Sequence, residues 1–111
     1  QIAQSYYKIV PKNFLSSLPV IKPDRTSVWA QYTLRIQNRE KVQENLQKAG
    51  IPTAIHYPKP LHLQECFGYM NHKSSDFPVA ETAANEVISL PMNPFLRQVE
   101  LDFIAENLSA I

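Results

Sequence analysis

Residues 27 to 36 read Ser-Val-Trp-Ala-Gln-Tyr-Thr-Leu-Arg-Ile, and this alternation of apolar and polar side chains predicts a β-strand. Apolar residues take the even positions from Val28 to Ile36, so we expect the even face to be core. The odd face carries Trp29 and Gln31, which could line a site or cover the outside of the sheet. We expect the second arrangement.

Helical and strand patterns continue on both sides of this strand. We expect helices over residues 2–9, 38–49, 78–87 and 97–109, and further strands over residues 51–57 and 88–90. Asn38 is expected to cap the second helix and Gly50 to end it in a left-handed conformation, with Arg39 on its solvated face. The class is therefore α+β, as a two-layer domain with about three strands and helices packed on one face.

The remaining stretches carry weaker patterns. Residues 11–24 contain three prolines and predict an irregular connector, with Phe14, Leu15 and Leu18 against the body of the domain. Residues 61–67 carry an ambiguous pattern that fits one helical turn, and residues 68–76 predict a polar loop.

The composition limits the classes of function. A chain of 111 residues with net charge +1 is expected to form one domain and offers no basic cluster for nucleic acid. No apolar run is long enough to span a membrane, and the lone Cys66 excludes an internal disulfide, so we expect a cytoplasmic protein. With two glycines, the chain cannot contain a glycine-rich phosphate loop.

His56, Tyr57 and Pro58 form the most informative polar motif. Pro58 and Pro60 restrict the backbone, so an imidazole and a phenol are expected on an extended, stiff segment that suits a polar ligand. The structural alternative is a satisfied histidine at a strand end beside a half-buried tyrosine. The residues alone leave both interpretations open.

Other site chemistries find less support in the sequence. His56, His62, Glu65, Cys66 and His72 lie close along the chain, but their spacing matches no zinc pattern. No serine or cysteine stands in the setting of an activated nucleophile. We therefore assign no metal ligand and no catalytic residue.

Five segments together resemble the C-terminal part of the DegT/StrS-type nucleotide-sugar aminotransferases, over roughly residues 25 to 108. In chain order they are Gln31-Tyr32-Thr33, Gly50-Ile51-Pro52-Thr53, His56 to His62, Phe77 to Glu81, and Ser89-Leu90-Pro91-Met92. This resemblance implies the aspartate aminotransferase fold (fold type I), pyridoxal 5'-phosphate as cofactor, a nucleotide-sugar substrate, glutamate as amino donor, and a homodimer.

The resemblance also implies how the chain is divided. Residues 1–24 would be the end of an interdomain helix and a connector, and residues 25–111 the small C-terminal domain. The family's Schiff-base lysine lies in the large domain before a glycine-rich stretch, and none of the seven lysines here has such surroundings. We therefore expect this chain by itself to be inactive, without residues that bind the cofactor.

By matched position, His56 and Tyr57 would bind the sugar nucleotide, and His62 would have a structural role, bonding a backbone carbonyl. The sequence from Ser27 to Tyr32 resembles most the branch that acts on UDP-linked 3-keto precursors of surface polysaccharides. Two alternatives stay open: a free-standing interaction or regulatory module of the same fold, and a relative that lost the lysine and acts as a dehydratase.

Overall fold

The computed structural model describes residues 1–12 and 15–110. Its elements are α1 (Ile2–Ile9), β1 (Leu15–Ser17), β2 (Tyr32–Ile36), α2 (Arg39–Lys48), the 3-10 turns η1 (Leu61–Leu63) and η2 (Glu65–Met70), α3 (Pro78–Glu86), β3 (Val87–Leu90) and α4 (Gln98–Ser109). The α+β class is confirmed. Within the described ranges, no helix is long and apolar enough to cross a membrane.

The sheet has three antiparallel strands in the order β1-β2-β3. Two of them, β2 and β3, correspond to expected strands, but the third is β1, which lies in the stretch expected to be an irregular connector. Three residues are too few to show an alternating pattern, so β1 left no signal in the sequence. Phe14 and the side chain of Leu15 lie outside the described part of the chain, and Leu18 packs partly buried against the core.

The strand expected over residues 51–57 is wrong. Only Ala54 pairs with the sheet, through two backbone hydrogen bonds of 3.1 and 2.8 Å with Ser89. Pro52 and Pro58 have no N–H group, so they cannot extend this bridge into a ladder. The chain around His56 therefore passes the edge of β3 as a loop.

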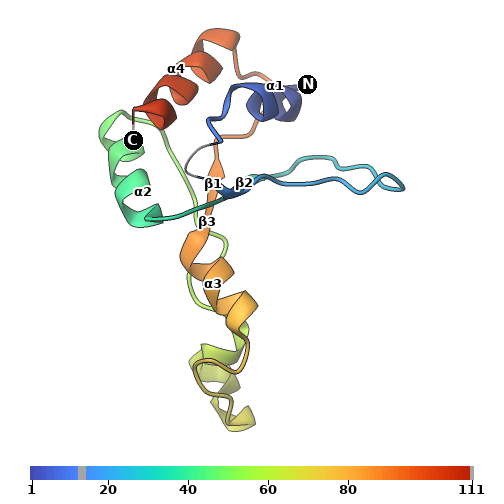
Figure 1. Cartoon of the computed structure of the whole chain (residues 1–111), viewed down its shortest axis with the longest axis vertical. Coiled ribbons are helices and arrows are strands. Elements are labelled where there is room, and N and C mark those ends of the chain that lie inside the picture. Colours follow the sequence, from blue (N-terminus) through green and yellow to red (C-terminus); the bar gives the residue numbers. More distant parts are fainter. Residues whose placement is uncertain (13–14, 111) are drawn as a thin grey trace.

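Only the second half of the strand expected over residues 27–36 forms. Tyr32, Leu34 and Ile36 are buried as predicted, but Val28 is 98% exposed. Residues 18–31 form a long arm that projects from the molecule in Figure 1, so no neighbouring strand is available to pair with Val28.

The core lies between β2, β3 and the helices α1, α2 and α4. It contains the predicted stripes of α2 (Val42, Leu46) and α4 (Leu101, Ile104, Leu108), together with Tyr6 of α1. We call these three helices and the three strands the body. Helix α3 contributes no residue to this core and lies below β3 in Figure 1, between the sheet and the outer end of the molecule, so the expectation that all helices pack together on one face is wrong for α3.

Two helix boundaries follow from local chemistry. Gly50 has a φ of 77° just after α2, as predicted for a left-handed ending. Pro78 stands in the first turn of α3, where its missing N–H group costs no hydrogen bond. Asn38 precedes α2 as expected, but its side chain makes no capping hydrogen bond.

Two side chains differ from the expected exposure. Arg39 is buried, because its guanidinium donates a hydrogen bond to the Ala84 carbonyl of α3. Val79 was expected to face inward with Ala83, Ala84 and Val87, but it is 77% exposed. Ala84 is the buried residue of α3, so this helix meets the body only at its C-terminal end.

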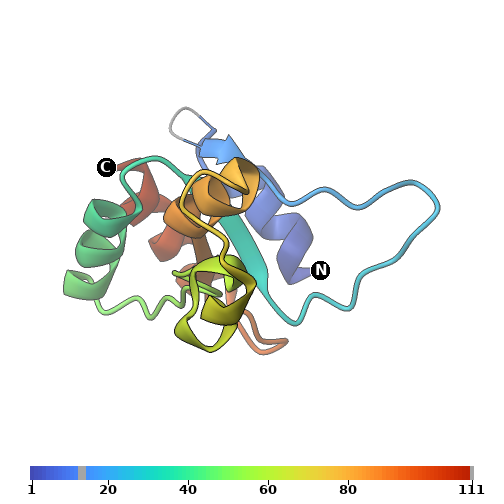
Figure 2. The same cartoon turned by 90° about the horizontal axis from the view of Figure 1, so that it is seen from below.

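Residues 61–77, which we call the outer segment, contain η1 and η2 and lead into α3. Figure 2 shows this segment, in yellow-green, beside α3 and away from α4. None of its residues is buried. Its position relative to α3 therefore depends on contacts other than a packed core.

Candidate functional site: an exposed histidine and tyrosine beside a groove

His56 and Tyr57 lie in the loop between the Ala54 bridge and η1, and both are exposed. The exposed fraction of Tyr57 is 72%. The centroids of the two rings are 5.6 Å apart, and the rings are arranged edge to face. Neither ring lies in the hydrophobic core, and Tyr57 is exposed rather than half-buried as the structural alternative expected. Their donors and acceptors are available to a ligand.

A groove of about 500 Å3 adjoins both rings. The rest of its lining comes from the residues after Tyr57, the outer segment, α3 and the start of β3. The lining residues are His56, Tyr57, Lys59, Pro60, Leu61, His62, Gln64, Phe77, Ala80, Ala83, Ala84 and Val87. The small alanines of α3 leave room for a ligand, and the residues on both sides of Pro60 supply the polar groups of the lining.

A second groove, of about 350 Å3, lies on the other side of His56. It is lined in part by Gln31, Thr53 and Ser89, so it offers amide and hydroxyl groups. We expected Gln31 to cover the outside of the sheet, and the structure places it in this groove instead. Trp29, expected beside it, packs partly buried against the core.

The sequence carried one weak signal for this second groove. Gln31 is a polar residue directly before the buried part of the strand, and Thr53 belongs to the Gly50 to Thr53 segment. Nothing in their spacing showed that they would meet, because Gln31 and Thr53 come from separate parts of the chain that are joined only through β3.

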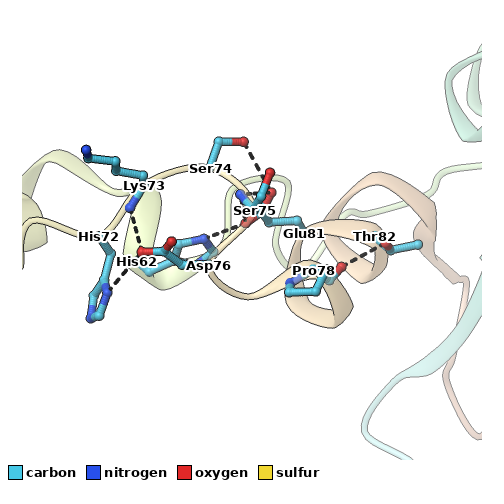
Figure 3. Close-up of polar contacts among 9 residues, drawn as sticks. All are labelled: His62, His72, Lys73, Ser74, Ser75, Asp76, Pro78, Glu81 and Thr82. Carbon is cyan, nitrogen blue, oxygen red and sulfur yellow. Dashed lines mark hydrogen bonds and ion pairs between the residues drawn. The ribbon is translucent and has the colours of Figure 1, made fainter.

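His62 is one of the residues that line the first groove, and the exposed fraction of its side chain is 7%. Its Nε2 donates to the Glu81 carboxylate, with 2.9 Å between Nε2 and Oε1. Figure 3 shows this contact between the outer segment and α3. The expected partner, a backbone carbonyl, is therefore wrong, and a carboxylate takes its place.

The carboxylates of this region are held in the charged form. The hydrogen bond from His62, followed by those from the amides of Ser75 and Phe77, keeps the pKa of Glu81 below its ordinary value. The amide of Lys73, followed by the ring of His72, lowers the pKa of Asp76. Both groups are thus acceptors and not proton donors near neutral pH.

Neither a metal nor pyridoxal phosphate has a site in the described residues. No group of three His, Cys, Asp or Glu side chains within them converges to hold a metal ion. All seven lysines are exposed, whereas a lysine that forms a Schiff base is typically activated by burial or by a neighbouring cation. The residues present therefore do not fit the cofactor.

The described residues form a small α+β domain with grooves on its surface, and comparison with known proteins identifies the family. The family model of the DegT/DnrJ/EryC1/StrS aminotransferase family matches residues 1–109. The chain belongs to this family.

Two curated relatives show the range of similar proteins. The UDP-2-acetamido-2-deoxy-3-oxo-D-glucuronate aminotransferase of Pseudomonas aeruginosa is 43% identical over 91 residues, which are 82% of this chain and 24% of that protein. The dTDP-3-amino-3,6-dideoxy-alpha-D-galactopyranose transaminase of Aneurinibacillus thermoaerophilus is 34% identical over 102 residues, which are 92% of this chain and 28% of that protein.

The fold has a counterpart among solved structures. The chain superposes on DesV of S. venezuelae, crystallised with a ketimine intermediate, with a TM-score of 0.91 and 29% identity, covering 98% of this chain and 29% of DesV. The chain thus spans about a quarter of the length of the relatives it matches.

Proposed function

We propose that this chain is the small C-terminal domain of a pyridoxal-phosphate-dependent sugar aminotransferase, which converts a keto sugar nucleotide into an amino sugar nucleotide. Residues 25–111 form this domain, and residues 1–24 are the end of an interdomain helix and a connector. The cofactor is held by a large domain outside these residues, in a homodimer, with glutamate as the amino donor. Family membership and the exposed lysines support this division of labour.

In this proposal His56 and Tyr57 bind the sugar nucleotide and do not carry out the covalent chemistry. The observation that carries it is the exposed pair at the edge of the 500 Å3 groove. Imidazole and phenol groups can hydrogen-bond sugar hydroxyls or phosphate oxygens and so orient a substrate. Reactive groups on the other domain would then meet a substrate in a defined position.

The substrate we propose is UDP-linked, and the amino sugar serves surface polysaccharide biosynthesis. The sequence from Ser27 to Tyr32 supports the UDP-linked class, as does the substrate in the name of the Pseudomonas relative. The Aneurinibacillus relative is named for a dTDP sugar. Comparing UDP- and dTDP-linked keto sugars with the complete enzyme distinguishes the two classes.

The first experiment measures substrate affinity in the complete enzyme with His56→Ala and Tyr57→Phe. Each variant removes a hydrogen bond worth on the order of 1 kcal/mol, so we expect KM for the sugar nucleotide to rise about fivefold while kcat changes little. Tyr69→Phe is the matched control, because Tyr69 is 75% exposed and lies outside the groove. Unchanged KM and kcat in both variants would remove His56 and Tyr57 from the substrate site.

The second experiment tests the division between domains. The isolated chain, mixed with pyridoxal phosphate, is expected to show no transaminase activity and no specific lysine aldimine absorbing in the visible range. A specific aldimine formed by this chain alone would contradict the proposal, since the Schiff-base lysine would then lie within residues 1–111.

A further inference from the structure

The outer segment forms one wall of the groove without contributing to the core. Leu61, His62, Gln64 and Phe77 all line the groove, yet no residue of the segment is buried. Leu61 is 68% exposed, so little apolar burial holds this wall in place. Polar contacts must therefore set its distance from α3.

Glu81 of α3 receives hydrogen bonds from both ends of the outer segment. His62, near its beginning, donates to Oε1 at 2.9 Å. Near its end, the Ser75 amide donates to Oε1 and Oε2 at 2.8 and 3.1 Å, and the Ser74 hydroxyl donates to Oε2 at 3.4 Å. Figure 3 shows these donors converging on one carboxylate. One side chain thus closes the whole loop.

The other polar contacts near this carboxylate join only residues close to the end of the outer segment. Asp76 accepts from the Lys73 amide at 2.9 Å and contacts His72 Nδ1 at 3.4 Å, so it stabilises only the turn before α3. The Phe77 ring lies edge-on to both His62, at 4.8 Å, and His72, at 5.0 Å. The Phe77–His62 contact thus also brings the two ends of the segment together, and Glu81 is the group that joins both ends by hydrogen bonds.

We propose that Glu81 is a positioning residue: by joining His62 to Ser74 and Ser75, it holds the part of the groove lining that the outer segment supplies at the position the substrate needs. Glu81 does not line the groove and acts through the residues that do. The inference rests on the proposed function, because it takes the occupant of the groove to be the sugar nucleotide. If the outer segment is already ordered, the free energy of substrate binding is not reduced by the cost of ordering it.

The test compares Glu81→Ala with Glu86→Ala in the complete enzyme. The two glutamates are on the same helix, each with a side chain that is 19% exposed, and each accepts from a basic partner. Glu86 pairs with Arg35 of β2 at 2.8 Å and, among the described residues, makes no hydrogen bond or ion pair with the outer segment. Glu81→Gln keeps the side-chain length and one acceptor oxygen, and serves if the alanine variant does not fold.

Two measurements are made on each variant. Amide hydrogen exchange at Gln64, Phe67 and Ser75 should become about tenfold faster in Glu81→Ala, because the wall opens locally, and stay unchanged in Glu86→Ala. KM for the sugar nucleotide should rise about tenfold in Glu81→Ala with kcat within about twofold. Glu81→Gln should lie between Glu81→Ala and the unsubstituted protein in both measurements.

The outcomes separate this inference from the function it rests on. If His56→Ala and Tyr57→Phe raise KM and Glu81→Ala does not, the positioning role is overturned and the substrate site stands. If none of the three changes KM, the substrate assignment of the groove fails, and the inference fails with it. Faster exchange with unchanged KM overturns the positioning role and leaves Glu81 a purely structural contact.

Discussion

In the body, side chains such as Leu34, Ile88 and Leu108 have no exposed surface, and their burial brings α1, α2 and α4 onto the sheet. The outer segment contributes no residue to the core, and one carboxylate links its two ends to α3. The body is thus held by apolar contacts spread over many residues, and the outer segment by a few polar contacts. The lesson is that the proposed substrate groove is lined mainly by parts outside the body, namely the loop of His56 and Tyr57, the outer segment and α3, where polar contacts decide the geometry.

The largest expected effect compares one substitution in the two regions. Leu34→Ala removes a completely buried side chain from the middle of β2 and should lower the free energy of unfolding by about 2–5 kcal/mol. Leu61→Ala makes the same chemical change in the outer segment and should alter it by less than about 0.5 kcal/mol. Urea unfolding of both variants checks the difference, and equal losses would show that the outer segment shares the core.

A smaller effect compares the two glycines. Gly50 has a φ of 77° and open space around it, so Gly50→Ala should cost about 1 kcal/mol through backbone strain alone. Gly68 of η2 is equally open and needs no left-handed conformation, so Gly68→Ala should be neutral or stabilise by less than about 1 kcal/mol. Thermal unfolding measures both, and a stabilising Gly50→Ala would contradict the left-handed ending of α2.

The smallest effect is acid opening of the outer segment. The pKa of Glu81 is lowered in the folded protein, so its contribution to stability is complete above the ordinary value of 4.5 and is lost as the pH falls through the lowered value. The amide signal of Ser75 in an NMR titration should therefore change with a midpoint below 4.5, while the amides of α4 stay unchanged there.

The pKa of the neighbouring Asp76 is also lowered, and His62 and His72 are the basic side chains that contact these two carboxylates. The variant Glu81→Gln is the control, because it removes the titrating carboxyl and should remove the Ser75 transition. A Ser75 midpoint at or above 4.5 would mean that the carboxylate is not held by its donors.

Much of the body was predictable because its signals are local and repeat with a fixed period. The stripes of α2 and α4, the even face of β2 and the left-handed Gly50 all follow from residues within a few positions of one another. The wrong expectations concern partners distant in sequence. Residues 51–57 resemble a strand in composition, but only Ala54 finds a partner on β3.

The candidate site divides in the same way. The sequence shows that an imidazole, a phenol and a proline stand together at His56, Tyr57 and Pro58, and their chemistry is enough to predict polar contacts there. Its surroundings could not be predicted. Gln31 reaches the second groove because β2 lies next to β3, and Glu81 meets His62 because the outer segment folds back on α3.

The sequence by itself determined the α+β class, the helices with their apolar faces, and the donor and acceptor groups of His56 and Tyr57, because these depend on residue type and on short-range periodicity. Only the tertiary structure decided which strands pair, that Arg39 is buried against α3, and that Glu81 closes the groove wall. Those outcomes depend on contacts between distant segments, which form only when the burial of the core has brought the segments together.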